Sequence, residues 1–256
     1  MSLTATLLGT GTSQGVPVIA CDCPVCTSTD PRDQRLRSSI WIQTQGKSIV
    51  IDSGPDFRQQ MLRAQVHHLD AIVYTHLHKD HVAGMDDVRA YNYRTRQPMP
   101  IYADARTLQR LQEEFPYVFD GTNYPGIPQV TTHELDGSPF LAEGVPMTPI
   151  PVLHHRLPVL GFRVGGFAYV TDANHIPPAS MALLQGLDVL ILNALRHEPH
   201  VSHFTLQEAL AVIAELQPRQ AYLTHISHLL GTHAEVSRML PDNVALAYDG
   251  QVITLP

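Results

Sequence analysis

Thr75-His76-Leu77-His78-Lys79-Asp80-His81 closes an apolar run, residues 71–75, that is predicted to form a buried β-strand. Three histidines and one aspartate thus lie within six residues at a strand end, where a turn can bring their side chains to one point. Imidazole nitrogen binds Zn, Mn and Fe, and carboxylate oxygen binds Mn and Mg. A solvated polar loop has no reason to concentrate four such groups, so this stretch predicts a metal site.

The composition is that of a globular protein rich in histidine. The 256 residues include 15 histidines, against 17 lysines and arginines together. Because 16% of the residues are charged and 44% are hydrophobic, we expect one folded domain over 1–256. The net charge of −7 argues against a nucleic-acid partner. The sequence has no membrane-spanning run and no signal-peptide pattern, which predicts a cytoplasmic protein with no membrane partner.

Short apolar strands alternate with amphipathic helices along the chain, which predicts an α+β fold with two sheets and helices packed outside them. Capping boxes at Thr205 and Thr232 open two helices, and Asp249-Gly250 is typical of a two-residue hairpin turn. Residues 116–139 predict a long irregular loop. The predicted strands are 4–8, 39–44, 48–52, 71–75, 100–102, 161–164, 167–171, 189–193, 221–224, 244–248 and 252–255. The predicted helices are 56–65, 84–93, 105–114, 178–185, 206–216 and 232–240.

The pattern T-H-x-H-x-D-H is the signature of the metallo-β-lactamase superfamily, which this sequence resembles over nearly its whole length. Further motifs follow in the family's order, namely Ile51-Asp52-Ser53-Gly54, His154 after Ile150-Pro-Val-Leu, Asp172 after Tyr169-Val-Thr, and His225 after Leu223-Thr. The resemblance implies a four-layer αββα sandwich with two divalent metal ions at one edge of the sheets.

The resemblance also implies a role for each of these residues. Asp52 would orient the metal ligands through hydrogen bonds. His155 competes with His154, but neighbouring side chains point apart, and the register of the next segment with the family favours His154. Zn and Mn both suit this set of side chains. One ion would be bound by His76, His78 and His154, the other by Asp80, His81 and His225, and Asp172 would bridge them.

The three cysteines, Cys21, Cys23 and Cys26, form a C-x-C-x-x-C cluster. An odd number at such short spacing makes a poor disulfide framework and favours a metal site, the alternative being three reduced structural thiols. Three thiolates need a fourth ligand to complete a tetrahedral structural zinc site, and His228 is the candidate. Because His228 lies three residues after His225, such a zinc ion would brace the loop that carries a predicted catalytic ligand.

The cysteine cluster, Thr224-His225-Ile-Ser-His228 and the segment from Gly9 to Pro17 together resemble the PhnP-like phosphodiesterases of the bacterial carbon–phosphorus lyase pathway. This resemblance implies a dimeric enzyme that hydrolyses a small anionic phosphodiester, such as a cyclic phosphate on a phosphorylated ribose. Attack would be by a metal-bound hydroxide, with Asp80 and Asp172 among the catalytic residues. His203 matches the proposed general acid that protonates the leaving oxygen, and His200 is the alternative.

Other functions remain open from the sequence. A thioester or lactone hydrolase can use the same fold, since a fold does not determine its substrate. An RNA nuclease of the tRNase Z type would need a basic arm that this acidic sequence lacks. An accessory protein with a degenerate site is disfavoured by the intact set of predicted ligands. The arginines near the motifs that could bind phosphate are Arg58, Arg89, Arg94, Arg156 and Arg196.

Overall fold

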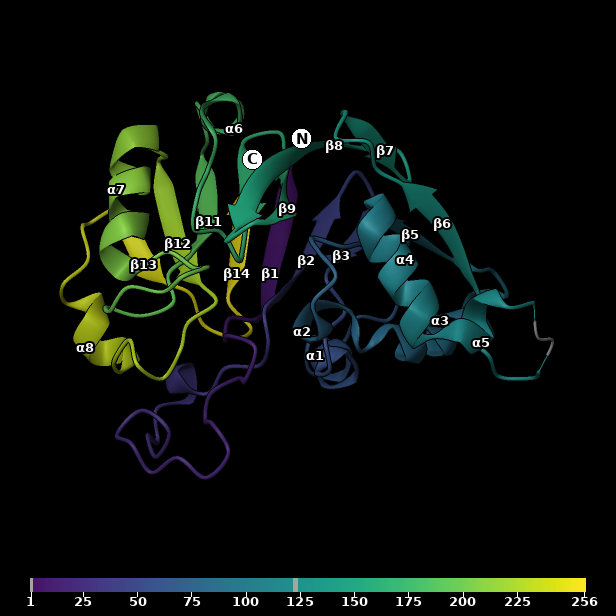
Figure 1. Cartoon of the computed structure of the whole chain (residues 1–256), viewed down its shortest axis with the longest axis horizontal. Coiled ribbons are helices and arrows are strands. Elements are labelled where there is room, and N and C mark those ends of the chain that lie inside the picture. Colours follow the sequence, from purple (N-terminus) through teal and green to yellow (C-terminus); the bar gives the residue numbers. More distant parts are fainter. Residues whose placement is uncertain (1, 122–123) are drawn as a thin grey trace.

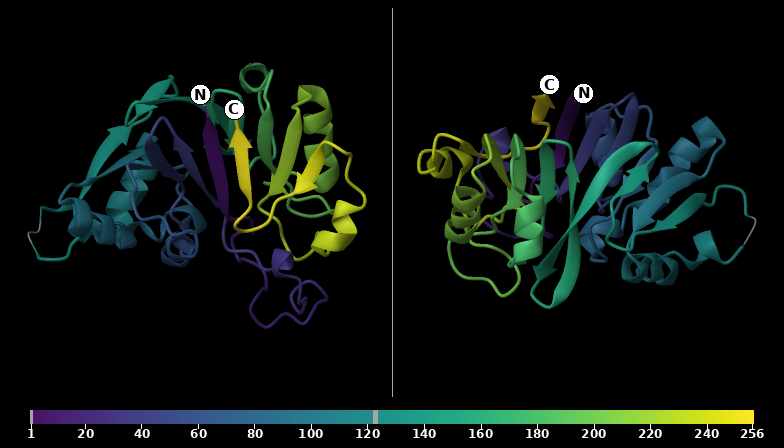
Figure 2. Two further views of the ribbon diagram at one scale, coloured as in Figure 1. Left: turned by 180° about the vertical axis from the view of Figure 1, so that it is seen from behind. Right: turned by 90° about the horizontal axis from the view of Figure 1, so that it is seen from above.

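The computed structural model describes residues 2–121 and 124–256. Within these residues, two seven-stranded sheets pack face to face and helices cover their outer faces (Figures 1 and 2). The strand order is β14-β1-β2-β3-β4-β5-β6 in the first sheet and β13-β12-β11-β10-β9-β8-β7 in the second. The predicted four-layer α+β sandwich is therefore confirmed.

The elements have the following bounds. The strands of the first sheet are β1 (Leu3–Gly9), β2 (Ser39–Thr44), β3 (Lys47–Ile51), β4 (Ala71–Val73), β5 (Met99–Ala103), β6 (Val130–Glu134) and β14 (Val252–Leu255). Those of the second are β7 (Phe140–Ala142), β8 (Val145–His154), β9 (Leu157–Val164), β10 (Phe167–Val170), β11 (Val189–Asn193), β12 (Gln220–Thr224) and β13 (Val244–Leu246). The helices are α1 (Phe57–Arg63), α2 (Lys79–Val82), α3 (Arg89–Thr95), α4 (Ala105–Glu114), α5 (Pro116–Phe119), α6 (Pro178–Leu183), α7 (Leu206–Leu216) and α8 (His233–Ser237), with 3₁₀ turns η1 (Pro31–Asp33) and η2 (Met85–Val88).

Alternating side chains of the central strands fill different layers of the core. In β11, Val189 and Ile191 pack between the two sheets, whereas Leu190 and Leu192 pack against the outer helices. This strand lies between parallel neighbours and is apolar on both faces, as expected of a strand covered on both sides. Burying each such aliphatic side chain contributes about 1.5–3 kcal/mol. Helices α1, α3 and α4 cover the first sheet, and α7 and α8 cover the second (Figure 1).

Several predicted elements differ from the structure. The strand β8 was not predicted, because prolines at 146, 149 and 151 argue against a strand interior. In the structure Pro146 lies opposite Leu141 of β7, whereas Pro149 and Pro151 lie beyond the end of the pairing with β7 and have partners only in β9. The predicted irregular loop 116–139 contains α5 and β6, and its residues 122–123 lie outside the described part of the chain. β6 was missed because its side chains are mostly exposed and lack an apolar alternation.

The predicted hairpin at Asp249-Gly250 is wrong. The strands β13 and β14 on either side of it belong to different sheets, so the segment crosses from one sheet to the other. The turn itself exists, with Gly250 at a φ of 86°. The buried Asp249 carboxylate holds it by accepting hydrogen bonds from the amides of Thr10 and Leu36, both at 2.8 Å. The residues Asp249-Gly250 predict the turn correctly, but a turn does not determine which strands pair.

Helix signals in the sequence were more reliable. Both predicted capping boxes are present, Thr205 with Glu208 in α7 and Thr232 with Glu235 in α8. The predicted helix 84–93 is divided between η2 and α3, and the other helices end within a few residues of their predicted bounds. None of the helices in the described residues is sufficiently long and apolar to span a bilayer.

Candidate metal centre

The predicted ligands and the orienting residue Asp52 meet at one edge of the sandwich, at the ends of five strands. Asp52 follows β3, the His76–His81 turn follows β4, His154 ends β8, and Asp172 and His225 follow β10 and β12. Asp52, Asp172 and His225 have left-handed backbone conformations, with φ of 67°, 58° and 54°. This conformation ends the β pairing at the point where each side chain leaves the sheet. It costs a residue with a Cβ roughly 1–2 kcal/mol, so the surrounding structure must enforce it.

Asp80, His81, Asp172 and His225 form one group of possible metal ligands. His81 Nε2 lies 3.2 Å from Asp80 Oδ2 and 3.3 Å from Asp172 Oδ2, and His225 Nδ1 lies 3.2 Å from the same Asp172 oxygen. Nitrogen and oxygen ligands at 2.0–2.2 Å from one ion are about 3–3.5 Å apart. The spacing therefore fits a divalent ion, and the buried His81 Nε2 has no hydrogen-bond partner among the described residues.

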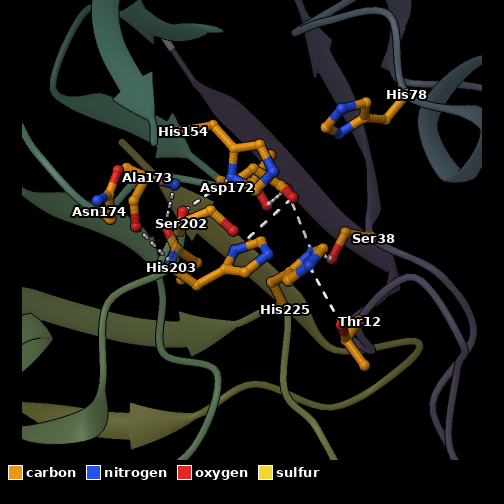
Figure 3. Close-up of polar contacts among 12 residues, drawn as sticks. Thr12, Ser38, His78, His154, Asp172, Ala173, Asn174, Ser202, His203 and His225 are labelled. Carbon is orange, nitrogen blue, oxygen red and sulfur yellow. Dashed lines mark hydrogen bonds and ion pairs between the residues drawn. The ribbon is translucent and has the colours of Figure 1, made fainter. Parts of the chain in front are cut away.

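His76, His78 and His154 lie beside this group. His76 Nε2 is 3.0 Å from His78 Nδ1, and the ring of His154 lies 5.0 Å from that of His78 and 5.8 Å from that of His76, centre to centre. His154 also forms a group of close ligand atoms with Asp172 and His203 (Figure 3). The structure thus brings all seven predicted ligands together, whereas His155 is exposed in the turn after β8.

Hydrogen bonds orient three of these imidazoles so that Nε2 is left for an ion. Asp52 Oδ2 accepts from Thr75 Oγ1 at 2.8 Å and from His81 Nδ1 at 2.7 Å. Because the Thr75 hydroxyl donates to Asp52, it accepts from His76 Nδ1, 2.9 Å away. His154 Nδ1 donates to the Ser202 carbonyl at 2.8 Å. The predicted orienting role of Asp52 thus has a direct geometric basis.

The electrostatics of the cluster also suit cations. Burial lowers the pKa of His76, His78 and His225, so these imidazoles are neutral, the form that binds a metal. Burial opposes protonation of His81 too, but three surrounding carboxylates, Asp80 foremost, raise its pKa well above the usual range. Without an ion, the carboxylates thus hold a proton on this histidine. A divalent cation would satisfy the same negative charge.

The four residues of the predicted structural zinc site also converge. His228 Nδ1 lies 3.3 Å from the sulfurs of Cys21 and Cys23 and 3.5 Å from that of Cys26. A tetrahedral zinc ion with Zn–S of 2.3 Å and Zn–N of 2.0–2.1 Å places sulfur and nitrogen about 3.5 Å apart. The Cys26 amide donates to Cys23 and lowers the pKa of that thiol to about 6, while burial raises the pKa of the Cys26 thiol to about 11. A cation would allow all three thiolates to coexist.

His203 lies closer to the cluster than its predicted alternative, His200. Its ring is 4.5 Å from that of His154 and 4.7 Å from that of His225, and its Nδ1 is 3.8 Å from Asp172 Oδ1 (Figure 3). The ring of His200 lies 5.1 Å from that of His203, and its Nδ1 contacts Ser202. Burial, with the neighbouring His225, lowers the pKa of His203 to about 3.

The five candidate arginines are placed differently from one another. Arg89 forms an ion pair with Asp86, and Arg196 donates to the carbonyls of residues 198 and 199 in its own loop. Arg58 and Arg94 line a cavity of about 300 Å³ between α1 and α3 that none of the predicted metal ligands lines. Arg156 is exposed in the turn between β8 and β9, two residues after His154.

A family model for the beta-lactamase superfamily domain matches residues 47–226, a span that includes all seven predicted ligands. The chain belongs to the beta-lactamase superfamily. Its fold and its cluster of histidines and aspartates are those of the metallo-β-lactamase type, a metallo-hydrolase fold that binds divalent metal. The predicted resemblance to this superfamily and to PhnP-like proteins is confirmed.

Known proteins with similar sequences or structures indicate which members of the superfamily this chain resembles. A crystal structure of a new diphosphatase from the PhnP family superposes with a TM-score of 0.94 at 44% identity, covering 100% of this chain and 98% of that one. An octanoyltransferase of Porphyromonas gingivalis is 38% identical over 247 residues, 95% of this chain. This chain spans only 50% of the length of that protein. A ribonuclease Z of Mycobacterium marinum is 25% identical over 252 residues, covering 86% of this chain and 85% of that protein.

Several supporting residues of this metallo-β-lactamase site escaped the sequence analysis. Thr12 Oγ1 lies 3.3 Å from His225 Nε2, and Ser38 Oγ lies 3.2 Å from His225 Nδ1. The Ser202 carbonyl orients His154, and Thr171 donates to Asp172 at 2.6 Å. Thr75 and Thr171 stand inside motifs and could have been found there. Thr12 lies inside the Gly9–Pro17 motif, but nothing in that motif indicates a contact with His225. Ser38 and Ser202 come from distant loops, and no sequence pattern marks them.

Proposed function

We propose that this protein is a metal-dependent hydrolase of small phosphoric diesters. The observation that carries the proposal is the convergence of the seven predicted metal ligands beside His203 at one edge of the sandwich. The similarity to the PhnP-family diphosphatase supports phosphorus as the reacting centre. The acidic net charge of −7 disfavours a long nucleic acid as the substrate.

Some residues of the chain would bind the metal ions, and others orient the imidazoles that bind them. His76, His78 and His154 would hold one divalent ion, Asp80, His81 and His225 the second, and Asp172 both. When bound, a pair of such ions, Zn or Mn, supplies a hydroxide nucleophile at neutral pH and stabilises charge on the phosphoryl oxygens. Asp52 and Thr75 keep the imidazoles in the tautomers that leave Nε2 free.

His203 is proposed to protonate the leaving oxygen. Its low pKa of about 3 makes the ring neutral near pH 7, because burial disfavours the imidazolium. An anionic phosphodiester beside the ring adds a negative charge that favours the imidazolium. The proton would thus reside on His203 mainly when a substrate is bound, and the two charged partners would neutralise each other in the buried site.

The cysteine cluster is proposed to hold a structural zinc ion. Cys21, Cys23 and Cys26 lie in a loop with little regular structure, and His228 lies on the loop that carries His225. The backbone of Ile226 is hydrogen-bonded on both sides to the 10–12 segment, with its amide 2.9 Å from the Thr10 carbonyl. A zinc ion would join the two loops at a second point and so stabilise the position of His225.

A diphosphate bond is the second candidate for the scissile bond. It is favoured by the 44% identical diphosphatase, and its phosphorus carries the same two bridging oxygens as that of a phosphodiester. The same side chains would act on either bond. The two substrates differ in the leaving group, since a phosphate leaves with less need of a proton than an alkoxide.

Purified protein loaded with Mn or Zn tests the proposal. We expect elemental analysis to find three metal ions per chain, and hydrolysis of bis(p-nitrophenyl) phosphate and of a ribose 1,2-cyclic phosphate. Diadenosine diphosphate tests the second candidate, and a glutathione thioester and tRNA test the thioesterase and nuclease alternatives. Turnover of the thioester without any phosphodiester turnover would contradict the proposal, as would failure to bind metal beyond one zinc ion.

A further inference from the structure

The side-chain amide of Asn174 connects two loops that carry histidines of the site. Asn174 lies two residues after Asp172, and its Oδ1 accepts a hydrogen bond from the backbone amide of His155 at 2.7 Å. Its Nδ2 donates to the carbonyl of Val201 at 3.1 Å. One side chain therefore joins the turn after His154 to the loop before His203.

Backbone hydrogen bonds continue this connection on both sides. The amide of Asn174 donates to the carbonyl of Leu153 at 2.9 Å, and the amide of Phe204 donates to the carbonyl of Ala173 at 2.8 Å. The Ser202 carbonyl, next to Val201, accepts from His154. The segments 153–155, 172–174 and 201–204 thus form one closed set of contacts. Val201 is 72% exposed, so its side chain does little to hold the loop in place.

Only a side chain with both a donor and an acceptor can make both Asn174 contacts. The amide of His155 requires an acceptor and the carbonyl of Val201 requires a donor. An aspartate at this position would keep the first contact and place two oxygens against each other at the second. An alanine would lose both contacts.

We propose that Asn174 is a positioning residue that holds His203 where it can protonate the leaving oxygen. This inference rests on the proposed function. In the step concerned, a hydroxide oxygen forms a new bond to phosphorus while the phosphorus–oxygen bond to the leaving group breaks, and the electron pair of the broken bond stays on the leaving oxygen. The leaving oxygen takes the proton of the His203 imidazolium, which becomes a neutral imidazole. Misplacing such a group by about 1 Å can cost about 10²-fold in rate.

The leaving group separates this role from a merely structural one. p-Nitrophenolate is stable as an anion near neutral pH and leaves without a proton, whereas phenolate needs one more strongly. A displaced His203 should slow the hydrolysis of methyl phenyl phosphate and leave the hydrolysis of methyl p-nitrophenyl phosphate almost unchanged. A general loosening of the fold should slow both equally.

The experiment compares Asn174→Asp and Asn174→Ala with Asn92→Asp on both substrates. Asn92 is a matched control, because its amide joins α3 to residue 129 in the same way, far from the metal centre. For both Asn174 variants we expect kcat to fall about 10–100-fold on methyl phenyl phosphate and less than about 3-fold on the p-nitrophenyl ester. Asn92→Asp should change kcat equally on the two esters. Asn174→Asp and Asn174→Ala should lose kcat to the same extent, which would exclude an effect of the added charge.

A double variant and hydrogen exchange complete the test. Asn174→Asp combined with His203→Ala should be no slower on methyl phenyl phosphate than His203→Ala alone, since both act through one proton transfer. Amide exchange in residues 197–204 should rise in Asn174→Asp and stay unchanged in Asn92→Asp. Equal rate losses on the two esters, additive losses in the double variant, or unchanged exchange would each overturn the inference. If the parent protein hydrolyses neither ester, the proposed function fails, while the exchange measurement still decides whether Asn174 holds the loop.

Discussion

The two clusters of possible metal ligands are built in different ways. The seven-residue cluster is largely buried and takes its side chains from strand ends of both sheets, so its geometry depends on the whole sandwich. The cysteine cluster is only half-buried and lies on a loop whose regular structure is limited to turns and η1. The comparison indicates that the fold organises the first cluster, whereas in the second a bound ion would organise the fold. Loss of a side chain should therefore mainly affect reactivity in the first and stability in the second.

The largest expected effect is at Asp172, whose carboxylate contacts both His81 and His225. Asp172→Asn removes a charge from the centre of the buried cluster, so we expect kcat/KM for bis(p-nitrophenyl) phosphate to fall about 10³-fold or more. Metal content by elemental analysis should fall below that of the parent, with the zinc of the cysteine cluster retained. The control Asp188→Asn, on an exposed ion pair with Arg219, should be neutral. Full activity of the Asp172 variant would show that the cluster is not the reaction centre.

A smaller loss is expected when a residue orients ligands without binding an ion. Asp52 accepts from the Thr75 amide through Oδ1 and from the Thr75 hydroxyl and His81 Nδ1 through Oδ2, so the NH2 group of Asp52→Asn must face at least one donor. We expect the metal affinity, measured by titration with a competing chelator, to weaken about 10–100-fold. Excess metal should restore most of the activity. An affinity equal to that of the parent would mean that the sandwich alone orients the imidazoles.

The cysteine cluster should respond in the opposite sense. Cys23→Ser is expected to lose one zinc ion per chain and to lower the Tm by about 2–4 °C for each kcal/mol of stability lost. Activity at saturating metal should fall less than in the Asp172 and Asp52 variants. Ile19→Ser is the control, because Ile19 lies on the same loop and is 93% exposed. If Cys23→Ser abolished activity but left the Tm unchanged, the division between the two clusters would be wrong.

The smallest effect concerns pH, next to the loop of the cysteine cluster. Burial, with the Arg35 guanidinium nearby, lowers the pKa of His233 to about 4 from the usual 6.5. Between these values the unfolded chain binds more protons than the folded one, so the stability present above about pH 6.5 is lost as the pH falls toward 4. His233→Gln should reduce this loss by about 1–2 kcal/mol. Urea unfolding at pH 7.5 and 4.5 measures it, with the exposed His67→Gln as the control.

Ligands that stand next to one another in the sequence could be predicted more directly than ligands that stand alone. His76, His78, Asp80 and His81 stand together after a buried strand, so local pattern and chemistry suffice to predict their convergence. His154, by contrast, follows an apolar stretch that contains three prolines, and the choice between it and His155 depended on the register with the family. The sandwich followed from the order of elements, since alternating apolar strands and helices have few ways to bury both faces.

Contacts between distant loops could not have been predicted from the same patterns. The Ser202 carbonyl acts through one hydrogen bond and the Asn174 side chain through two, and any polar residue in a loop looks equivalent in sequence. The hairpin expected at Asp249-Gly250 failed for a related reason. The turn residues determine the backbone conformation there, but the partner of each strand depends on which sheet has a free edge.

The left-handed backbone at Asp52, Asp172 and His225 implies a trade-off between durability and reactivity. Glycine accepts that conformation without a Cβ penalty, so at these three positions the residue best suited to the backbone is one that cannot do the chemistry. Retaining side chains there leaves the apoprotein less stable than its fold permits. Replacements that raise the thermal stability of this fold would therefore fall at the same positions that an enzyme must keep.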